Sequence, residues 1–277
     1  MGACITPFYV RDKISQENIP VPCGKCPECK SRRVSGWSFR LQQEGKISSS
    51  AHFLTLTYDT SFVPISPDGE MQLCVRDVQL FIKRLRKRAK GKLPIKYYLV
   101  GEYGTKTLRP HYHLILFNAE LSDIQPAWDM GDIYYGEVNG ASIGYTLKYM
   151  CKESKLDEND TRKKEFSLMS KRLGAAYLTA QMVNWHRNDM LKRICIMIED
   201  NKRIAMPRYF KGKIFTEKEL KVIAEVTAIG HEERQKKYEA EMFKVHGRRA
   251  STVKAEFDRQ SFKKMHRNAV KDRKDYV

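Results

Sequence analysis

The chain has 277 residues, with 51 Lys and Arg against 33 Asp and Glu, and a formal net charge of +18 at pH 7. No stretch approaches the roughly 18 apolar residues of a membrane span, and a hydrophobic content of 42% is adequate for a packed core, so membrane and fibrous classes are excluded. The basic excess favours nucleic acid as partner, with a generally basic, well-solvated surface as the alternative. The N-terminus lacks the pattern of a secretory signal, so we expect a cytoplasmic protein with no membrane association.

The N-terminal segment contains a cysteine run, Cys23-x-x-Cys26-x-x-Cys29, and Cys4 lies upstream of it. Seven cysteines without an export signal favour thiol or metal chemistry over a disulfide framework. These four thiols can supply the tetrahedral ligands of a structural zinc. Two alternatives stay open: the spacing also occurs in iron–sulfur proteins, and the run can simply be reduced thiols near the start of a helix.

A basic helix is predicted from about Cys29 to Glu44, directly after the cysteine run. Arg32, Arg33 and Arg40 surround Trp37 in this segment. A surface that combines arginines with an aromatic ring can pair with phosphates and stack on bases. The alternative is a helix whose aromatic and apolar side chains enter the core.

The next elements follow from periodicity and turn residues. Residues 53–58 alternate apolar and hydroxyl side chains as a strand does, and residues 60–69 carry the turn residues of a loop. Residues 75–90 predict an amphipathic helix with a basic outer face. The remaining predicted elements are strands at 95–103, 110–117, 133–138 and near 193–199, and helices at 142–153 and about 217–277.

This order of elements predicts an α+β fold with an antiparallel central sheet flanked by helices. Apolar side chains on both faces of residues 110–117 indicate that this strand is central. We expect three segments: a cysteine-rich basic extension at 1–50, a core at 51–215 and a charged helical C-terminal region at 216–277.

Two histidines in the predicted strand 110–117 form a candidate metal site. His111 and His113 point to the same face, because side chains alternate along a strand. Glu102 falls opposite His111 if the preceding hairpin turns near Lys106. Two imidazoles and a carboxylate leave positions open for substrate oxygens on Mg²⁺ or Mn²⁺. Two structural histidines are the alternative, and the apolar residues that follow argue against a zinc hydrolase.

Four residues of the predicted helix 142–153 share one side at spacing i, i+3, i+4 and i+7: Tyr145, Lys148, Tyr149 and Lys152. We expect the apolar stripe of this helix to dock on the sheet and these phenols and ammonium groups to face away together. A phenol has a pKa near 10, and neighbouring lysines favour its nucleophilic phenolate form. An ordinary solvent-facing surface of Tyr and Lys is the alternative.

Three segments of the chain resemble, in order, the three motifs of HUH endonucleases, the family of rolling-circle replication initiators. They are Phe-Leu-Thr-Leu-Thr-Tyr at 53–58, Arg-Pro-His-Tyr-His-Leu-Ile-Leu-Phe at 109–117 and Tyr-x-x-Lys-Tyr-x-x-Lys at 145–152. The chain is more closely similar to the initiators of microvirus-type single-stranded-DNA phages of the gokushovirus branch, over about residues 4–210. That similarity rests on Pro-Cys-Gly-Lys-Cys-Pro-Glu-Cys (22–29), Gly-Glu-Tyr-Gly (101–104), Ser-Leu-Met-Ser-Lys-Arg (167–172) and Met-Pro-Arg-Tyr (206–209).

The resemblance implies a core of HUH type with ferredoxin-like topology and a metal-dependent endonuclease and strand transferase. In this family a tyrosine attacks a phosphate of single-stranded DNA at an origin, forming a 5′-phosphotyrosine and a 3′-hydroxyl primer. A second tyrosine, one helical turn away, permits the displaced strand to be rejoined. The implied partners are origin DNA and a host helicase and polymerase in the bacterial cytoplasm.

The resemblance also implies roles for individual residues. Tyr145 and Tyr149 correspond to the nucleophiles and carry Lys148 and Lys152 beside them. The residues expected at the DNA belong to the N-terminal helix and to the first two motifs: Arg32, Arg33, Arg40, Thr55, Thr57 and Arg109.

Two other functions share these features. A transposase or relaxase uses the same chemistry, but two tyrosines at Y-x-x-x-Y spacing favour an initiator over single-tyrosine transposases. A non-catalytic, zinc-stapled DNA- or RNA-binding protein retains the fold without cleavage. Formation of a covalent protein–oligonucleotide adduct separates the enzyme from the binding module.

Overall fold

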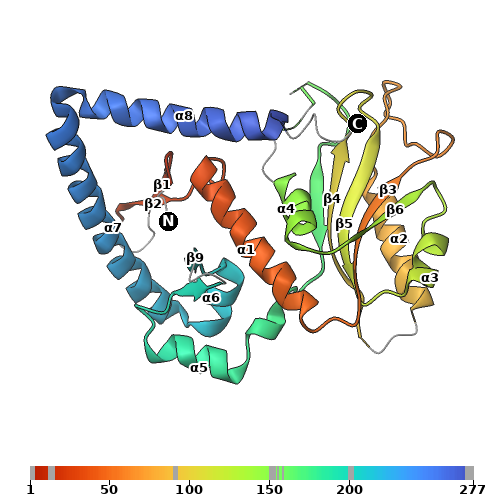
Figure 1. The fold of residues 1–277 in the computed structure, drawn as a ribbon, viewed down its shortest axis with the longest axis horizontal. Helices are drawn as coiled ribbons and strands as arrows, with labels where there is room; N and C mark the ends of the chain where they lie inside the picture. The colour runs from red at the N-terminus through yellow and green to blue at the C-terminus, as the bar shows by residue number, and fades with distance from the viewer. Residues whose placement is uncertain are drawn as a thin grey trace. The chain divides into compact units, whose positions relative to one another are not determined.

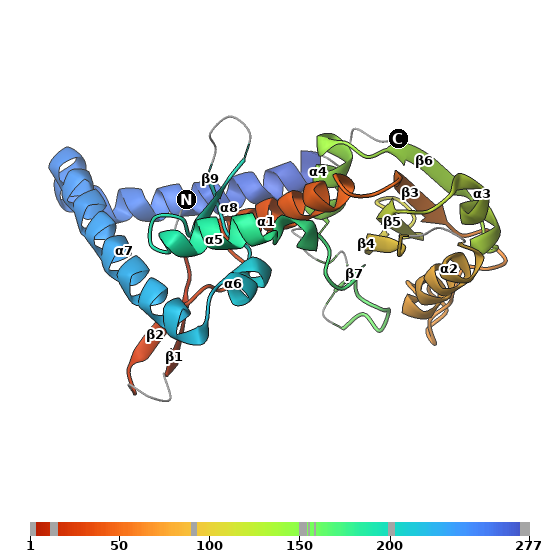
Figure 2. The ribbon, with the colours of Figure 1, turned by 90° about the horizontal axis from the view of Figure 1, so that it is seen from below.

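The computed structural model describes residues 4–11, 16–89, 93–149, 154, 156–157, 159–198 and 203–271 (Figures 1 and 2). The chain divides into two compact units. One comprises Trp37–Ala176, and the other comprises Met1–Gly36 together with Tyr177–Val277. Within the described ranges, no helix combines the length and apolar character needed to cross a bilayer.

The unit Trp37–Ala176 is built on a five-stranded antiparallel sheet of order β6-β3-β5-β4-β7. Its central strand is β5, as the apolar residues on both of its faces predicted. The flanked antiparallel α+β architecture is thereby confirmed. The strands are β3 (Ala51–Thr57), β4 (Lys96–Tyr103), β5 (Pro110–Phe117), β6 (Ile133–Glu137) and β7 (Phe166–Met169).

Helices cover both faces of this sheet. On one face α2 (Val75–Arg88) buries Phe81 and Leu85 in the main core, together with Tyr112 of β5. Figure 2 shows α4 (Gly140–Lys148) on the opposite side from α2. His111 and His113 alternate with Tyr112 along β5, so their imidazoles lie on the α4 side. In the sequence, α3 (Leu121–Ile124) and the 3₁₀ turn η1 (Gln125–Ala127) lie between β5 and β6.

The hairpin of β4 and β5 has the predicted register. Glu102 pairs with His111, and Tyr103 pairs with Pro110. The connection is closed by the Gly104 N–H, which donates to the Arg109 carbonyl oxygen at 2.9 Å. Directly opposed residues of an antiparallel pair share a face, so the carboxylate and the imidazoles lie together.

The helix α4 begins two residues earlier than predicted, at Gly140, because Asn139 and Ser142 form a capping box. Its described part ends at Lys148, with Tyr149 as the capping residue. Ile143 and Leu147 are buried as expected. Residues 150–153 lie outside the described part of the chain, so the predicted extension to residue 153 stays a prediction.

The second unit combines two small antiparallel strand pairs, β1-β2 and β8-β9, with helices. The helix α1 (Pro27–Gly45) starts in this unit and continues into the other. The helical C-terminal region is confirmed, and α7 begins at a capping box of Thr216 and Glu219. The 3₁₀ turn η2 (Ala175–Tyr177) lies at the boundary between the two units in the sequence. The other elements are β1 (Phe8–Arg11), β2 (Asn18–Val21), α5 (Ala180–Asn188), β8 (Cys195–Met197), β9 (Arg203–Ala205), α6 (Arg208–Ile214), α7 (Glu217–His246), η4 (Gly247–Arg249) and α8 (Ala250–Lys271).

The segments predicted at 1–50, 51–215 and 216–277 were assigned by function. The division into two compact units does not test which segment has which function. The three segments stay a prediction.

Candidate metal centre and tyrosine pair

Glu102, His111 and His113 converge on the α4 side of the sheet, each with a ligand atom within 4.8 Å of the others. Glu102 Oε1 lies 2.7 Å from His111 Nε2 and 3.2 Å from His113 Nε2. A carboxylate oxygen between two ring nitrogens is stable only with positive charge between them, either protons or a cation. The three residues that the sequence predicted as metal ligands are therefore neighbours in space.

Hydrogen bonds on the far side of each ring fix the orientation of the imidazoles. His111 Nδ1 lies 3.3 Å from the Arg109 carbonyl oxygen, which can only accept, so this nitrogen donates. His113 Nδ1 is hydrogen-bonded to Thr55 Oγ1 at 2.9 Å. Both rings therefore turn Nε2 toward Glu102, which is how outer hydrogen bonds orient histidine ligands at metal sites.

Glu102 is 6% exposed and keeps its negative charge. Burial would raise the pKa of this carboxyl, but hydrogen bonds from His111 and His113 outweigh burial and hold the pKa well below its usual range. Two imidazoles and one charged carboxylate fit a divalent cation and leave positions open for other ligands. The same donor set suits several divalent ions and does not select one.

Two tyrosine rings lie against His113. The ring centroids of Tyr145 and Tyr149 are 5.1 Å and 5.2 Å from that of His113, and 5.1 Å from each other. Tyr149 stacks on the imidazole at an interplanar angle of 12°, and Tyr145 meets it edge-on at 83°. The helix pattern alone predicted that the two tyrosines face away from the sheet. They face the sheet instead, because the side of α4 that carries them is turned toward β5.

Phe53 of β3 completes the aromatic surroundings. Its ring centroid lies 5.9 Å from that of His113 and 6.1 Å from that of Tyr145. Sequence reasoning did not select Phe53 for the site. The alternation that placed Thr55 on this face also places Phe53 there, two residues earlier, and that signal was available.

The phenol of Tyr149 is held in its neutral form. Burial raises the pKa of this group, and the charge of Glu102 together with hydrogen bonds to Tyr145 and Glu102 adds to the rise. This direction is opposite to the one expected from neighbouring lysines. Lys148 Nζ lies 5.8 Å from the ring centroid of Tyr145, and Lys152 lies outside the described residues.

Two of the arginines expected at the DNA bind neighbouring backbone. Arg40 Nε donates to the Leu173 carbonyl oxygen at 3.0 Å, and its guanidinium lies 4.1 Å from the ring centroid of Trp37. Arg109 Nη2 donates to the Tyr58 carbonyl oxygen at 2.6 Å. These contacts stabilise the unit and do not by themselves assign the arginines to DNA.

The other residues expected at the DNA differ in their surroundings. Thr57 Oγ1 donates to the Asp132 carbonyl oxygen at 3.2 Å. Arg33 is exposed, whereas Arg32 lies beside a cysteine, with Nη2 3.5 Å from Cys29 Sγ. Thr55 is hydrogen-bonded to His113, so its hydroxyl supports a residue of the candidate metal site.

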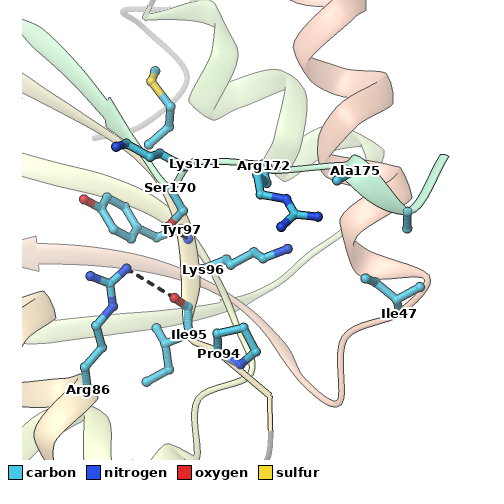
Figure 3. Close-up of a pocket in the computed structure, with 12 residues that line it drawn as sticks. Ile47, Arg86, Pro94, Ile95, Lys96, Tyr97, Ser170, Lys171, Arg172 and Ala175 are labelled. Carbon is cyan, nitrogen blue, oxygen red and sulfur yellow. Dashed lines mark hydrogen bonds between the residues drawn. The ribbon is translucent and has the colours of Figure 1, made fainter. Parts of the chain in front are cut away.

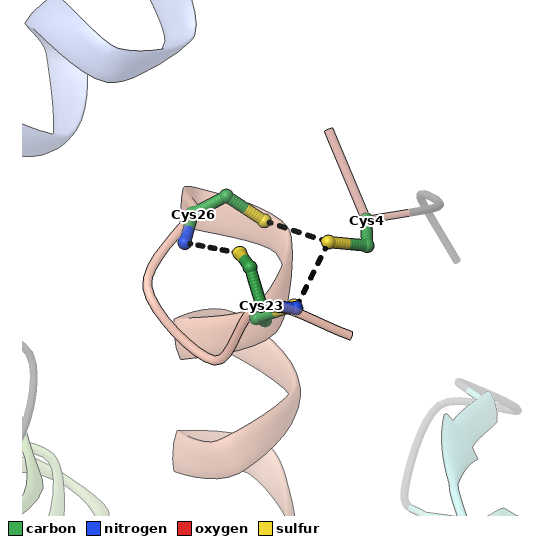
Figure 4. Close-up of side chains that lie close together, drawn as sticks. Cys4, Cys23 and Cys26 are labelled. Atoms are coloured by element: carbon green, nitrogen blue, oxygen red, sulfur yellow. Dashed lines mark hydrogen bonds between the residues drawn. The ribbon is translucent and has the colours of Figure 1, made fainter. Parts of the chain in front are cut away.

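The four N-terminal cysteines form a second candidate metal centre, as the sequence predicted, and Figure 4 shows Cys4, Cys23 and Cys26 of this set. Cys4, Cys23, Cys26 and Cys29 are free thiols. A hydrogen bond from Thr6 is the largest effect that lowers the pKa of the Cys23 thiol, to about 5. A thiolate is therefore available in this cluster near neutral pH.

A pocket of about 780 Å³ opens near the start of β4, the end of that strand opposite Glu102 (Figure 3). Tyr97 and Ser170 line it together with basic side chains. Lys96 is paired with the buried carboxylate of Glu44 at 2.6 Å. No single sequence motif predicted the pocket, because the basic residues of its lining come from three separate segments. These residues are Arg86, Lys96, Lys171 and Arg172.

Fold and site define an α+β protein with a histidine–carboxylate cluster and a tyrosine pair on one face of an antiparallel sheet. Residues 51–154 match the family model of the replication-associated protein ORF2/G2P. This segment contains β3, β4, β5 and α4, which carry the whole cluster. No solved structure matches the chain.

Three phage proteins are similar over most of this chain. It is 30% identical to the replication-associated protein ORF2 of Spiroplasma virus 4, over 71% of this chain and 68% of that protein. It is 25% identical to the replication-associated protein VP4 of Bdellovibrio phage phiMH2K, over 73% and 70% of the two chains. For the replication-associated protein ORF4 of Chlamydia phage 1 the identity is 26%, over 72% and 54%. The chain belongs to the replication-associated protein ORF2/G2P family.

Proposed function

We propose that this protein is a replication initiator that nicks single-stranded DNA at an origin through a tyrosine nucleophile and a divalent metal. The observation that carries the proposal is the contact of both tyrosine rings with His113, at centroid distances of 5.1 Å and 5.2 Å. Membership of a family of phage replication-associated proteins supports the biological role. The motif resemblance to HUH endonucleases supplies the type of reaction.

In the proposed step, the phenol oxygen of Tyr145 or Tyr149 attacks a backbone phosphorus atom. The bond between phosphorus and the 3′-oxygen breaks as the tyrosine–phosphorus bond forms, which gives a 5′-phosphotyrosine. The phenol loses its proton and the departing 3′-oxygen gains one, leaving a 3′-hydroxyl as primer. The new ester conserves the phosphodiester bond, so a later 3′-hydroxyl can reverse the reaction and rejoin the strand.

Residues of the cluster have distinct parts in this step. Glu102, His111 and His113 would hold the cation, proposed as Mg²⁺ or Mn²⁺, which when bound would supply Lewis-acid polarisation of the scissile phosphate. The carboxylate of Glu102 also accepts a hydrogen bond from the Tyr149 hydroxyl, which keeps that hydroxyl at the cluster. Lys148 adds positive charge for the phosphate, and we propose the same part for Lys152.

The proposal extends to the surroundings of the site. The sheet is taken as an HUH-type core with ferredoxin-like topology, and residues 51–215 as the catalytic segment. DNA is proposed to reach the site past the ends of β3 and β5, and the exposed Arg33 is proposed to contact DNA as well. A host helicase and polymerase in the bacterial cytoplasm are the proposed partners.

The test uses single-stranded oligonucleotides that tile the replicon encoding the chain, with Mn²⁺ present. We expect the full-length protein to form a covalent adduct with one of them that survives denaturing electrophoresis. The double variant Tyr145→Phe with Tyr149→Phe removes both nucleophilic oxygens but keeps the rings on His113, so it should form no adduct and bind DNA about as tightly. Tyr134→Phe with Tyr135→Phe, two exposed tyrosines of β6, is the matched control and should retain the adduct.

An adduct formed by the Tyr145/Tyr149 double variant would locate the nucleophile elsewhere. DNA binding without any adduct in the unchanged protein would favour a non-catalytic binding module. Joining of a cleaved strand to foreign DNA instead of its own end would favour a transposase or relaxase.

A further inference from the structure

The cysteine cluster belongs to the unit Met1–Gly36 with Tyr177–Val277, and the proposed nicking reaction makes no use of it. All four sulfur atoms lie within 4.8 Å of one another. Cys26 Sγ and Cys4 Sγ are 3.8 Å apart (Figure 4). The members come from two places in the sequence, so the chain has folded to bring Cys4 back to the run.

The spacing of the sulfur atoms matches a bound ion better than a disulfide. A disulfide holds its sulfur atoms about 2.05 Å apart. Four sulfur ligands about 2.3 Å from one tetrahedral zinc ion lie about 3.8 Å from each other. The Cys26–Cys4 separation of 3.8 Å equals that edge. Sulfur ligands of an iron–sulfur cluster bind different iron atoms and stand farther apart, so the compact set favours a single ion.

Backbone N–H groups point at the sulfur atoms. Lys25 N and Cys26 N donate to Cys23 Sγ at 3.4 Å and 3.2 Å, and Cys23 N donates to Cys4 Sγ at 3.3 Å. The turn between Cys23 and Lys25 requires Gly24, whose φ is +73°. Donors of this kind stabilise the negative charge of metal-bound thiolates.

A permanent cation lies beside the cluster. Arg32 Nη2 is 3.5 Å from Cys29 Sγ, and Arg32 Nε is held by the Glu28 carbonyl oxygen at 3.4 Å. Four thiolates around Zn²⁺ carry a net charge of −2 by formal count. The guanidinium offsets part of that charge, which gives Arg32 a part in the cluster distinct from the DNA contact expected from sequence.

The elements that the cluster joins have little other support. All four residues of β1 are exposed, and in β2 only Val21 is even half-buried. A two-stranded hairpin without a buried face is marginally stable in water. A metal–thiolate centre supplies folding free energy that such a segment cannot obtain from a hydrophobic core.

We propose that Cys4, Cys23, Cys26 and Cys29 bind one structural Zn²⁺ as a closed tetrathiolate site. The ion fastens the N-terminal hairpin to the start of α1. With four protein ligands no position is open to substrate, so the site stabilises the fold and takes no part in chemistry. The proposal is independent of the nicking reaction.

The test measures metal in the purified full-length protein after dialysis against metal-free buffer. We expect one zinc per chain, loss of that zinc in Cys26→Ser, and its retention in Cys195→Ser, a free cysteine of β8 outside the cluster. Zinc can also bind the histidine cluster, so the sulfur ligands are identified by Co²⁺ exchange. Thiolate-to-cobalt charge-transfer absorption should appear in the unchanged protein and persist in His111→Ala with His113→Ala.

The cobalt measurement on the unchanged protein stands even if Cys26→Ser does not fold. Absence of thiolate-bound cobalt there, or absence of stoichiometric zinc, overturns the proposal. Iron with acid-labile sulfide overturns it in favour of a cluster. Zinc lost from the histidine variant but kept in Cys26→Ser overturns it in favour of the other site.

Discussion

Thr55 and the backbone of Arg109 determine how the two imidazoles are presented. Each binds an Nδ1 atom, at 2.9 Å and 3.3 Å, and leaves Nε2 toward Glu102. Neither group is a metal ligand. Their effect is to hold the rings in one orientation, which would lower the entropic cost of binding the proposed cation.

Thr55→Val keeps the shape of the side chain but removes the hydroxyl that holds His113. We expect the Mn²⁺ concentration for half-maximal adduct formation to rise roughly 10- to 100-fold, the usual effect of losing such a partner. The rate at saturating Mn²⁺ should change little. Thr55→Ser restores the hydroxyl and should restore the metal dependence, which is read from adduct formation across a Mn²⁺ titration.

A different result would return Thr55 to the role first expected from sequence. If Thr55→Val leaves the metal dependence unchanged and weakens binding of single-stranded oligonucleotides, the hydroxyl acts at the DNA and not on His113.

At the scale of single elements, the capping box of α4 positions the tyrosine pair. The side chain of Asn139 accepts from the Ser142 N–H at 2.9 Å, and Ser142 Oγ accepts from the Asn139 N–H at 2.9 Å. The described helix has nine residues, so its first turn is a large part of its length. Loss of the cap therefore affects the segment that carries Tyr145.

Asn139→Ala should destabilise the protein by about 0.5–2 kcal/mol and slow adduct formation. Thr216→Ala is the matched control, since Thr216 caps α7 with the same motif in the other unit. It should cost similar stability and leave the adduct rate unchanged. Denaturant unfolding measures the first quantity and a time course of adduct formation the second. Equal slowing in both variants would mean that general stability, not the placement of α4, controls the rate.

Elements with a strong local signal were predicted well from sequence. The strand β3 alternates apolar and hydroxyl side chains, β5 carries apolar side chains on both faces, and a short Gly-containing loop fixed the Glu102–His111 register. The orientation of Tyr145 and Tyr149 was not predictable, because it depends on how α4 lies on the sheet. The start of α4 was missed for a local reason, the capping role of Asn139.

At the scale of the whole molecule, the chain carries a net charge of +18. The pocket of Figure 3 gathers Arg86, Lys171 and Arg172 from α2 and from the segment after β7. Such a convergence depends on tertiary structure, so periodicity and spacing cannot reveal it. Its charge suits the phosphates of a DNA strand extending from the proposed site.

Lys171→Gln removes one exposed charge from that pocket. If the pocket binds a DNA phosphate, the slope of log K against log salt for a single-stranded oligonucleotide should fall by about 0.7. Lys87→Gln removes one exposed charge from α2 outside the pocket lining and should leave the slope unchanged. Fluorescence anisotropy at several salt concentrations gives both slopes.

Equal slopes for Lys171→Gln and the unchanged protein would remove the pocket from the DNA path. A lower slope in Lys87→Gln would instead extend that path over the basic face of α2.

The preassembled donors of Glu102, His111 and His113 have a practical consequence for anyone who handles the protein. If this trio of nitrogen and oxygen atoms holds the cation as proposed, it follows the general affinity series in which copper, nickel and zinc outcompete manganese and magnesium. Traces of nickel or copper left by affinity resins would then displace the ion supplied in an assay. We therefore expect adduct formation to be comparable between preparations only after each has been stripped with a chelator and reloaded.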